Sequence, residues 1–178
     1  MEKNKSFKVN NEIIRQLQSD DEKINLTVID KMRSSGKIGY IPYLIELANS
    51  TNFDTVHSSV FNLLNELKEK GATNYLCEAI RDNQFKTIRK KLVEACWQNG
   101  LNFAQHLSLF TDLLIHESDE ISFEAFTVIE NMEYMPQNSI LENEIEKLKS
   151  HLTGTDDPRQ YFIKEAIITI TKVLNQKN

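Results

Sequence analysis

The sequence predicts an all-α protein made of about five stacked helical hairpins. An apolar pattern with helical spacing recurs about every 33 residues along the chain. Only five glycines and three prolines occur in 178 residues, too few for a chain with many tight turns between strands. Apolar residues make up 40% and charged residues 26% of the chain, which is typical of a globular domain and not of a disordered one.

The repeat is visible when four apolar columns are aligned. They hold Ile24, Val56, Ile88, Ile121 and Phe162; Val28, Val60, Leu92, Ala125 and Ala166; Ile29, Phe61, Val93, Phe126 and Ile167; and Met32, Leu64, Cys96, Ile129 and Ile170. The columns lie at offsets of 0, 4, 5 and 8 residues, which fall on one side of a helix, and the opposite offsets are mostly polar. Each window therefore predicts a long amphipathic helix with one buried face.

Shorter apolar stretches between these long helices supply the first helix of each hairpin. The predicted hairpins span residues 10–34, 38–69, 73–98, 102–132 and 138–175, in a single domain over 9–178 that follows a flexible tail of residues 1–8. We expect glycines to end long helices and polar residues to cap helix starts, at Gly36, Gly71 and Gly100 and at Asp20, Asp54, Ser118 and Asp156. One hairpin alone buries too little apolar surface to fold, so consecutive hairpins must stack.

Three stretches carry a family resemblance. Residues 79–100, AIRDNQFKTIRKKLVEACWQNG, resemble the second half of a HEAT repeat, and residues 113–132 and 41–48 are similar to the same family. The resemblance covers about residues 10–175. It implies a right-handed α-α superhelix, a HEAT-like solenoid, whose long helices line a concave side.

HEAT repeats commonly carry a turn Asp and a following Arg that form a ladder between repeats. In this sequence only Arg89 fills the Arg position, with Asn83 in its turn, and only Asp157 fills the Asp position. We therefore expect that ladder to be largely absent, while the stacking of the hairpins is retained.

Charge and cysteine usage narrow the function classes. The net charge is −5, which argues against a general nucleic-acid binder because phosphate neutralisation needs an excess of cations. Cys77 and Cys96 lack metal-ligand spacing, and buried reduced thiols explain them better than a disulfide or a reactive pair. No apolar run reaches the roughly 20 residues of a membrane span, and the first residues lack the apolar core of a signal peptide. We expect a cytoplasmic protein.

No group of residues in the sequence has the pattern of a catalytic or metal site. The four histidines are isolated, without a chelating spacing or a neighbouring cysteine cluster: His57, His106, His116 and His151. Paired carboxylates lie at predicted helix starts, where they complement the helix dipole. We therefore expect no catalytic residue, no metal and no cofactor.

Charge is distributed unevenly around the third and fourth hairpins. From Leu92 to Glu146 there are eleven acids and no Lys or Arg, directly after a short basic cluster. On a concave side these acids would form a groove that steers a basic partner, although acids kept for solubility and a solvated basic face explain the same pattern. Two aromatic residues beside the core columns are either binding anchors or fillers of the seam between long helices, and we favour the seam. The candidate partner-binding residues are Lys90, Lys91, Glu94, Trp97, Glu120, Phe123, Glu124 and Asn131.

These features favour a non-catalytic scaffold or adaptor that holds a protein or peptide, with basic character, on the concave face. One alternative is an enzyme or nucleic-acid-acting protein on a HEAT scaffold, of the DNA-glycosylase or lyase kind. Another is a structural protein that forms homo-oligomers through the apolar last helix, residues 161–174. We expect neither nucleic acid nor membrane as the main partner.

Overall fold

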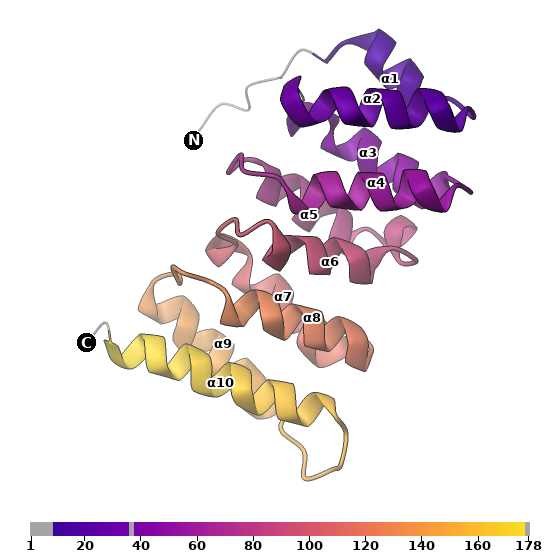
Figure 1. Cartoon of the computed structure of the whole chain (residues 1–178). Coiled ribbons are helices and arrows are strands. Elements are labelled where there is room, and N and C mark those ends of the chain that lie inside the picture. The colour runs from indigo at the N-terminus through magenta and orange to yellow at the C-terminus, as the bar shows by residue number, and fades with distance from the viewer. Residues whose placement is uncertain (1–8, 36–37, 177–178) are drawn as a thin grey trace. The chain divides into compact units, whose positions relative to one another are not determined.

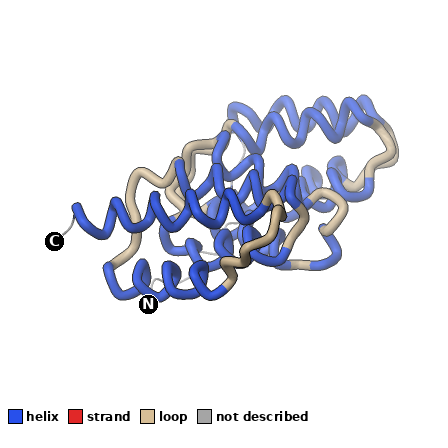
Figure 2. The backbone as a smooth tube through the Cα atoms, turned by 90° about the horizontal axis from the view of Figure 1, so that it is seen from below, coloured by secondary structure: helices blue, strands red, loops and turns tan. Residues whose placement is uncertain are grey.

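The computed structural model describes residues 9–35 and 38–176, and over these ranges the chain is helical (Figures 1 and 2). Within them the chain forms ten α-helices and three short 3-10 helices, and no strand. The predicted all-α class is thus confirmed for the described part of the chain. The expected tail at 1–8 and the expected helix end at Gly36 lie outside the described residues.

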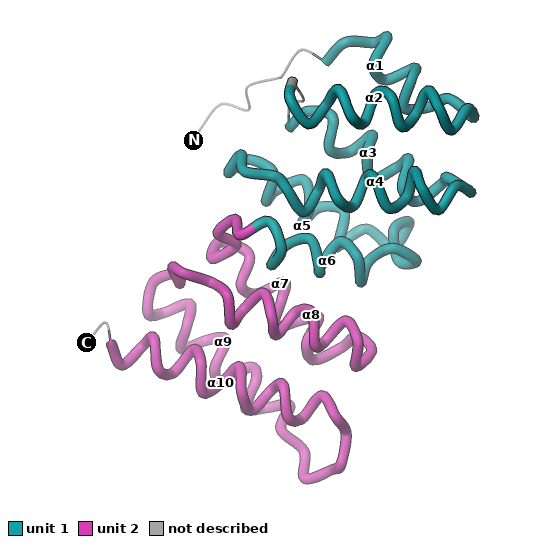
Figure 3. Tube along the Cα trace, in the orientation of Figure 1, with its two compact units in different colours: residues 1–99 teal, residues 100–178 magenta. Residues whose placement is uncertain are grey.

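The chain forms two compact units, residues 1–99 and 100–178 (Figure 3). The first unit holds α1 (Asn11–Leu17), α2 (Glu22–Ser35), η1 (Ile38–Tyr40), α3 (Ile41–Ser50), α4 (Asp54–Asn65), α5 (Ala72–Arg81), η2 (Asn83–Phe85) and α6 (Arg89–Gln98). In this unit α1 contacts α3 and α3 contacts α5, while α2 contacts α4 and α4 contacts α6. The first and second helices of successive hairpins therefore form separate layers, joined by contacts within each hairpin.

The second unit repeats this arrangement with two hairpins. It holds η3 (Ala104–His106), α7 (Leu107–His116), α8 (Asp119–Glu130), α9 (Asn138–Ser150) and α10 (Arg159–Gln176). Helix α7 contacts α9 and α8 contacts α10, in addition to the pairs within each hairpin. The single domain expected over 9–178 stays a prediction.

Most helix bounds agree with the sequence prediction to within a few residues, and the starts of α6 and α7 are the exceptions. The sequence predicts the fourth hairpin from residue 102, but its first α-helix begins at Leu107. It predicts the long helix of the third hairpin over 84–98, and this helix begins at Arg89. The reason is local, because the Asp82 carboxylate accepts a hydrogen bond from the Gln84 backbone N–H at 2.9 Å and caps the short helix η2 instead.

The repeated apolar columns form the core. Seventeen of the twenty aligned side chains are buried. The exceptions are Ile24, which is 42% exposed, and the half-buried Phe162 and Ile167. All three lie in α2 and α10, the first and last long helices of the described residues. The aligned side chains of the other three windows are all buried.

Of the two described glycines that were expected to end helices, Gly100 does so and Gly71 does not. Gly100 has φ +67°, the left-handed conformation expected of a residue that ends a helix. Gly71 does not end a helix: it precedes α5 with φ −65°. A Cβ at Gly71 would lie 2.8 Å from Ile38 Cδ1, so close packing explains this glycine.

The caps expected at Asp20 and Asp156 are each shifted by one residue. Asp21 Oδ1 accepts from the backbone N–H groups of Lys23 and Ile24 at 2.8 and 3.1 Å. Asp157 Oδ1 accepts from the Arg159 N–H at 2.9 Å. Asp54 and Ser118 stand at helix starts, but the cap positions of α4 and α8 carry no side-chain cap bond.

Candidate binding surface

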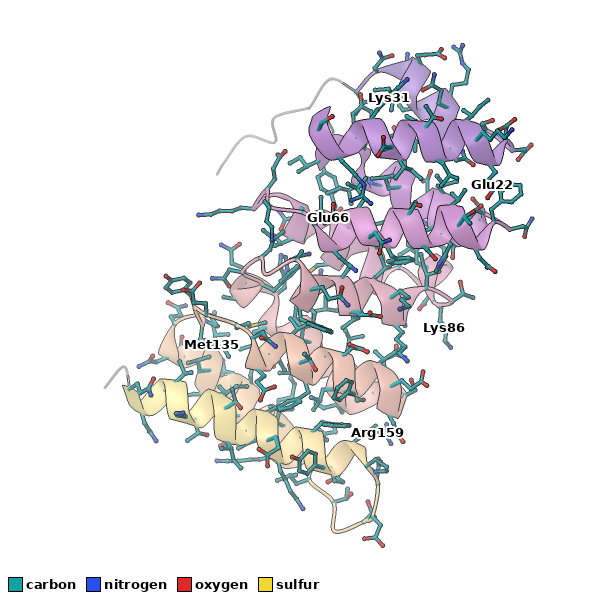
Figure 4. All side chains as sticks on the ribbon, in the orientation of Figure 1. Glu22, Lys31, Glu66, Lys86, Met135 and Arg159 are labelled. Carbon is teal, nitrogen blue, oxygen red and sulfur yellow. The ribbon has the colours of Figure 1, made fainter. Side chains whose placement is uncertain are left out.

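Polar side chains join the long helices of the first unit at the period of the repeat. The Thr55 hydroxyl on α4 donates to the Glu22 carboxylate on α2. At the other end of the same helices Arg33 pairs with Glu66 (Glu22 and Glu66 are labelled in Figure 4). Between α4 and α6, Asn65 Nδ2 donates to Gln98 Oε1 at 2.6 Å. Each pair is 33 residues apart, so this ladder takes the place of the absent Asp–Arg ladder.

A polar groove lies between α4 and α6, and we call it the α4–α6 groove. It has a volume of about 260 Å³. Its lining consists of His57, Ser58, Phe61, Asn62 and Asn65 from α4 and Lys91, Glu94 and Gln98 from α6. Two of the eight candidate residues, Lys91 and Glu94, therefore lie together in one groove.

The charges in this groove are paired. Lys91 Nζ lies 2.8 Å from Glu94 Oε2, and Gln98 Nε2 donates to Glu94 Oε1 at 2.8 Å. Gln98 in turn accepts from Asn65, so a chain of contacts crosses from α6 to α4. Because the Glu94 carboxylate is compensated, the groove presents amides and not the net negative charge that the sequence predicted.

The remaining candidates of the first unit are not among the residues that line the groove. Lys90 and Trp97 are both half-buried on α6. The His57 ring lies 4.8 Å from the Phe61 ring, centroid to centroid, which places an imidazole against the apolar floor of the groove. The choice between anchor and seam stays open for Trp97.

In the second unit Phe123 lies in a seam between long helices. Its ring centroid is 5.6 Å from that of Phe162 on α10, and Phe162 stacks on Phe126 at 5.9 Å. Phe123 nevertheless keeps 48% of its surface exposed. The contact supports the seam interpretation for this residue.

The sequence-based placement of Glu124 on an outward face is wrong. Glu124 is buried, because α8 packs against both α7 and α10 and so buries more than one stripe of residues. Glu120 on the same helix is exposed, as expected. Asn131 is exposed, and its amide donates to the Thr127 carbonyl at 2.8 Å. Glu124 therefore does not contribute to the proposed acidic groove, which stays a prediction for the other positions.

Arg89, one of the basic cluster, is a buried residue and not part of a solvated face. Its Nη2 donates to Asn83 Oδ1 at 3.1 Å and lies 3.5 Å from the Asp82 carbonyl oxygen. The contact joins the two positions that the repeat alignment had matched to the family's Arg and turn residue. Arg89 therefore stabilises the start of α6.

A second arginine joins the two hairpins of the second unit. Arg159 contacts the Asp157 carboxylate through Nε at 3.0 Å and Nη2 at 2.6 Å. Its Nη1 donates to the carbonyls of Ile115 and Glu117, at the end of α7, at 3.3 and 3.2 Å (Arg159 is labelled in Figure 4). The side-chain hydrogen bond from Arg159 lowers the pKa of Asp157 below its usual value of 3.8. No sequence pattern predicted this contact, which joins residues more than 40 positions apart.

The structure also shows where the cysteines and two of the histidines lie. Cys77 and Cys96 are free and buried, as predicted, and burial raises the pKa of Cys77 to about 12. His116 and His151, which the sequence analysis treated as isolated, lie with ring centroids 5.6 Å apart. Among the described residues, no three His, Cys, Asp or Glu side chains are grouped so that they could hold a metal ion.

None of the helices within the described ranges combines the length and the apolar character needed to cross a membrane. No model of a known protein family matches the chain, and no curated protein matches it significantly.

Proposed function

We propose that the chain is a non-catalytic scaffold or adaptor, a HEAT-like stack of helical hairpins, which holds an extended peptide segment of a partner protein in the α4–α6 groove. The observation that carries this proposal is the amide-rich lining of the groove, with Asn62, Asn65 and Gln98 on two neighbouring helices. The layered contacts within each unit and the polar ladder at 33-residue spacing support the stack.

The chemistry of these amides fits a peptide backbone. An extended segment presents N–H and C=O groups in alternation, and each Asn or Gln side chain offers both a donor and an acceptor. Asn62 and Asn65 are three residues apart on α4 and so lie on the same helix face. An amide row of this kind holds a backbone without selecting strongly among its side chains.

The size of the groove favours a peptide over a cofactor. Its volume of about 260 Å³ is below the roughly 300–1,000 Å³ of pockets that enclose small molecules. An extended segment that crosses the groove needs only partial enclosure, because its remaining groups stay in water or contact neighbouring helices.

Basic character in the partner stays part of the proposal, but its support lies outside the α4–α6 groove. Residues 100–178 contain thirteen acidic and six basic residues, whereas residues 1–99 contain thirteen acidic and fifteen basic ones. The surplus of acids in the second unit would raise the association rate of a basic partner at low salt.

The proposal is tested by selecting short random peptides on the full chain and measuring their affinity for a groove variant. The variant Asn62→Ala/Gln98→Ala removes two amides from the groove. Since a hydrogen bond contributes about 0.5–1.5 kcal/mol, the loss of two should weaken binding by about 1–3 kcal/mol, which is roughly five- to 150-fold. Glutamine and asparagine at these positions are exposed, so the variant should keep the helical circular dichroism of the parent.

The control removes two exposed amides elsewhere, in Asn143→Ala/Gln176→Ala on α9 and α10. Selected peptides should bind this control as they bind the parent. If no selected peptide distinguishes the two double variants, the α4–α6 groove is not the peptide site.

Self-association is the second candidate function, and α10 provides the observation that favours it. Tyr161 and Ile168, two turns apart on this helix, are 62% and 58% exposed. A homo-oligomer formed through α10 should become monomeric in Tyr161→Glu/Ile168→Glu, as measured by light scattering at high protein concentration. A monomeric parent chain at that concentration would remove this candidate.

A further inference from the structure

A second groove lies in the other helix layer of the first unit, between α3 and α5, and we call it the α3–α5 groove. It has a volume of about 170 Å³. Its apolar lining is Pro42, Ile45, Tyr75, Ala79 and Phe85, and its polar lining is Glu46, Glu78, Asp82 and Gln84. The groove thus combines an apolar floor with carboxylates.

Within the part of the chain that the structure describes, two of its three carboxylates form no ion pair. Asp82 is engaged, because its Oδ1 accepts the Gln84 N–H. Glu46 and Glu78 are both exposed, and neither forms an ion pair with another residue of the described ranges. Arg81 is one turn from Glu78, but its Nη1 donates along its own helix to the Cys77 carbonyl at 3.4 Å.

The second unit holds the corresponding carboxylates, two repeats later in the sequence, and there a lysine lies between them. Asp112 on α7 and Glu144 on α9 follow Glu46 and Glu78 by 66 residues. Lys147 Nζ lies 2.9 Å from Asp112 Oδ1 and 2.5 Å from Glu144 Oε2. A primary ammonium therefore fits between the carboxylates that this layer presents at these two positions.

Two differences distinguish the first unit. Arg81 corresponds to Lys147 at the same spacing of 66 residues, but it donates to the Cys77 carbonyl and forms no ion pair with Glu46 or Glu78. In the second unit the Thr111 hydroxyl donates to Glu144, which is buried. The corresponding residue in the first unit is Ile45, which has no side-chain donor, and Glu78 stays exposed. The Glu78 carboxylate is consequently available to a cation that comes from outside the chain.

We propose that the α3–α5 groove receives the side chain of a lysine or arginine from a partner protein. The charged end lies between Glu46 and Glu78, and the methylene stem packs on Tyr75 and the apolar floor. A volume of about 170 Å³ suits one long side chain and is well below that of pockets which enclose a cofactor. This site is separate from the α4–α6 groove and lies in the other layer, so the chain would contact partners on both.

The test again uses short random peptides selected on the full chain. Affinities are measured for the parent and for Glu46→Gln/Glu78→Gln, which keeps side-chain size and removes both charges. We expect a group of peptides that loses about tenfold in affinity on this variant, with a lysine or arginine in each member. Replacing that residue by glutamine in the peptide should give the same loss on the parent and little further loss on the variant.

Two control variants distinguish binding in the α3–α5 groove from long-range electrostatic attraction and from binding in the α4–α6 groove. Glu130→Gln/Glu142→Gln removes the same charge from two exposed positions of the second unit and should leave these peptides unaffected. Asn62→Ala/Gln98→Ala should leave them unaffected as well. The proposal is overturned if the dependent peptides lack a basic residue, if no peptide depends on Glu46 and Glu78, or if the Glu130/Glu142 control weakens binding equally.

Discussion

Two isoleucines of α2 give a matched test of the repeat, because both belong to aligned apolar columns but differ in burial. Ile29 is 1% exposed and Ile24 is 42% exposed. Replacing isoleucine by alanine removes three carbons, about 2.4 kcal/mol at ~0.8 kcal/mol for each carbon when the side chain is fully buried. At Ile29 an unfilled cavity adds to this, and we expect a loss of about 3–4 kcal/mol in the free energy of unfolding. At Ile24 the same reasoning gives at most about 1.4 kcal/mol, since much of the side chain already contacts water.

Urea denaturation followed by tryptophan fluorescence measures the free energy of unfolding of the first unit, which contains both isoleucines. Trp97 is the single tryptophan and lies in α6 of the first unit, as α2 does. The denaturation midpoint of Ile29→Ala should fall well below that of Ile24→Ala, with similar slopes for the two variants. Equal shifts, or a larger shift for Ile24→Ala, would refute the assignment of Ile29 to the core and of Ile24 to the surface.

Three further predictions follow from the second unit and the buried thiols. Glu124→Lys should unfold the second unit, since a reversed charge at a buried site costs several kcal/mol, whereas Glu120→Lys on the same helix should leave thermal unfolding nearly unchanged. Because the pKa of Asp157 is lowered, the contribution of its carboxylate to stability is present above about pH 4 and is lost as pH falls through that lowered value. Asp157→Asn should therefore lower the melting temperature at neutral pH and make it depend less on pH in the acid range. The control variant Asp156→Asn should change neither the melting temperature nor its pH dependence. Burial raises the pKa of Cys77 and Cys96, so both thiols should resist a disulfide reagent at pH 8 and react once urea unfolds the chain. For the same reason the free energy of unfolding should decrease as pH rises above about 9, where the thiols of the unfolded chain ionise. Rapid reaction of the native chain with the reagent would contradict the burial of the two thiols.

Sequence periodicity predicted the helices and most of the core because a single helix buries one stripe toward its hairpin partner. It failed at Glu124 because the width of the buried face depends on how many helices surround α8, which periodicity along one helix does not report. It also failed at Ile24 and Phe162, in the first and last long helices of the described residues, where part of the predicted stripe is exposed or half-buried.

The polar contacts divide into two kinds. Pairs such as Asn65–Gln98 and Thr111–Glu144 are 33 residues apart, close to the repeat length, so the repeat itself indicates which polar residues of neighbouring hairpins can meet. Contacts such as Arg159 with the end of α7, or His116 with His151, depend on the register between helices of different hairpins. No periodic signal in the sequence encodes that register, and these contacts required the structure.

The most direct test of the proposed peptide site is a nuclear magnetic resonance titration of the nitrogen-15-labelled chain with a peptide selected as described above. The side-chain amide groups of Asn62, Asn65 and Gln98 give their own signals, which report on the α4–α6 groove without any substitution. We predict that these three signals shift together and saturate with the affinity measured for the peptide. Saturable binding that leaves all three unchanged, with shifts confined to other helices, would contradict the assignment of this groove as the binding site.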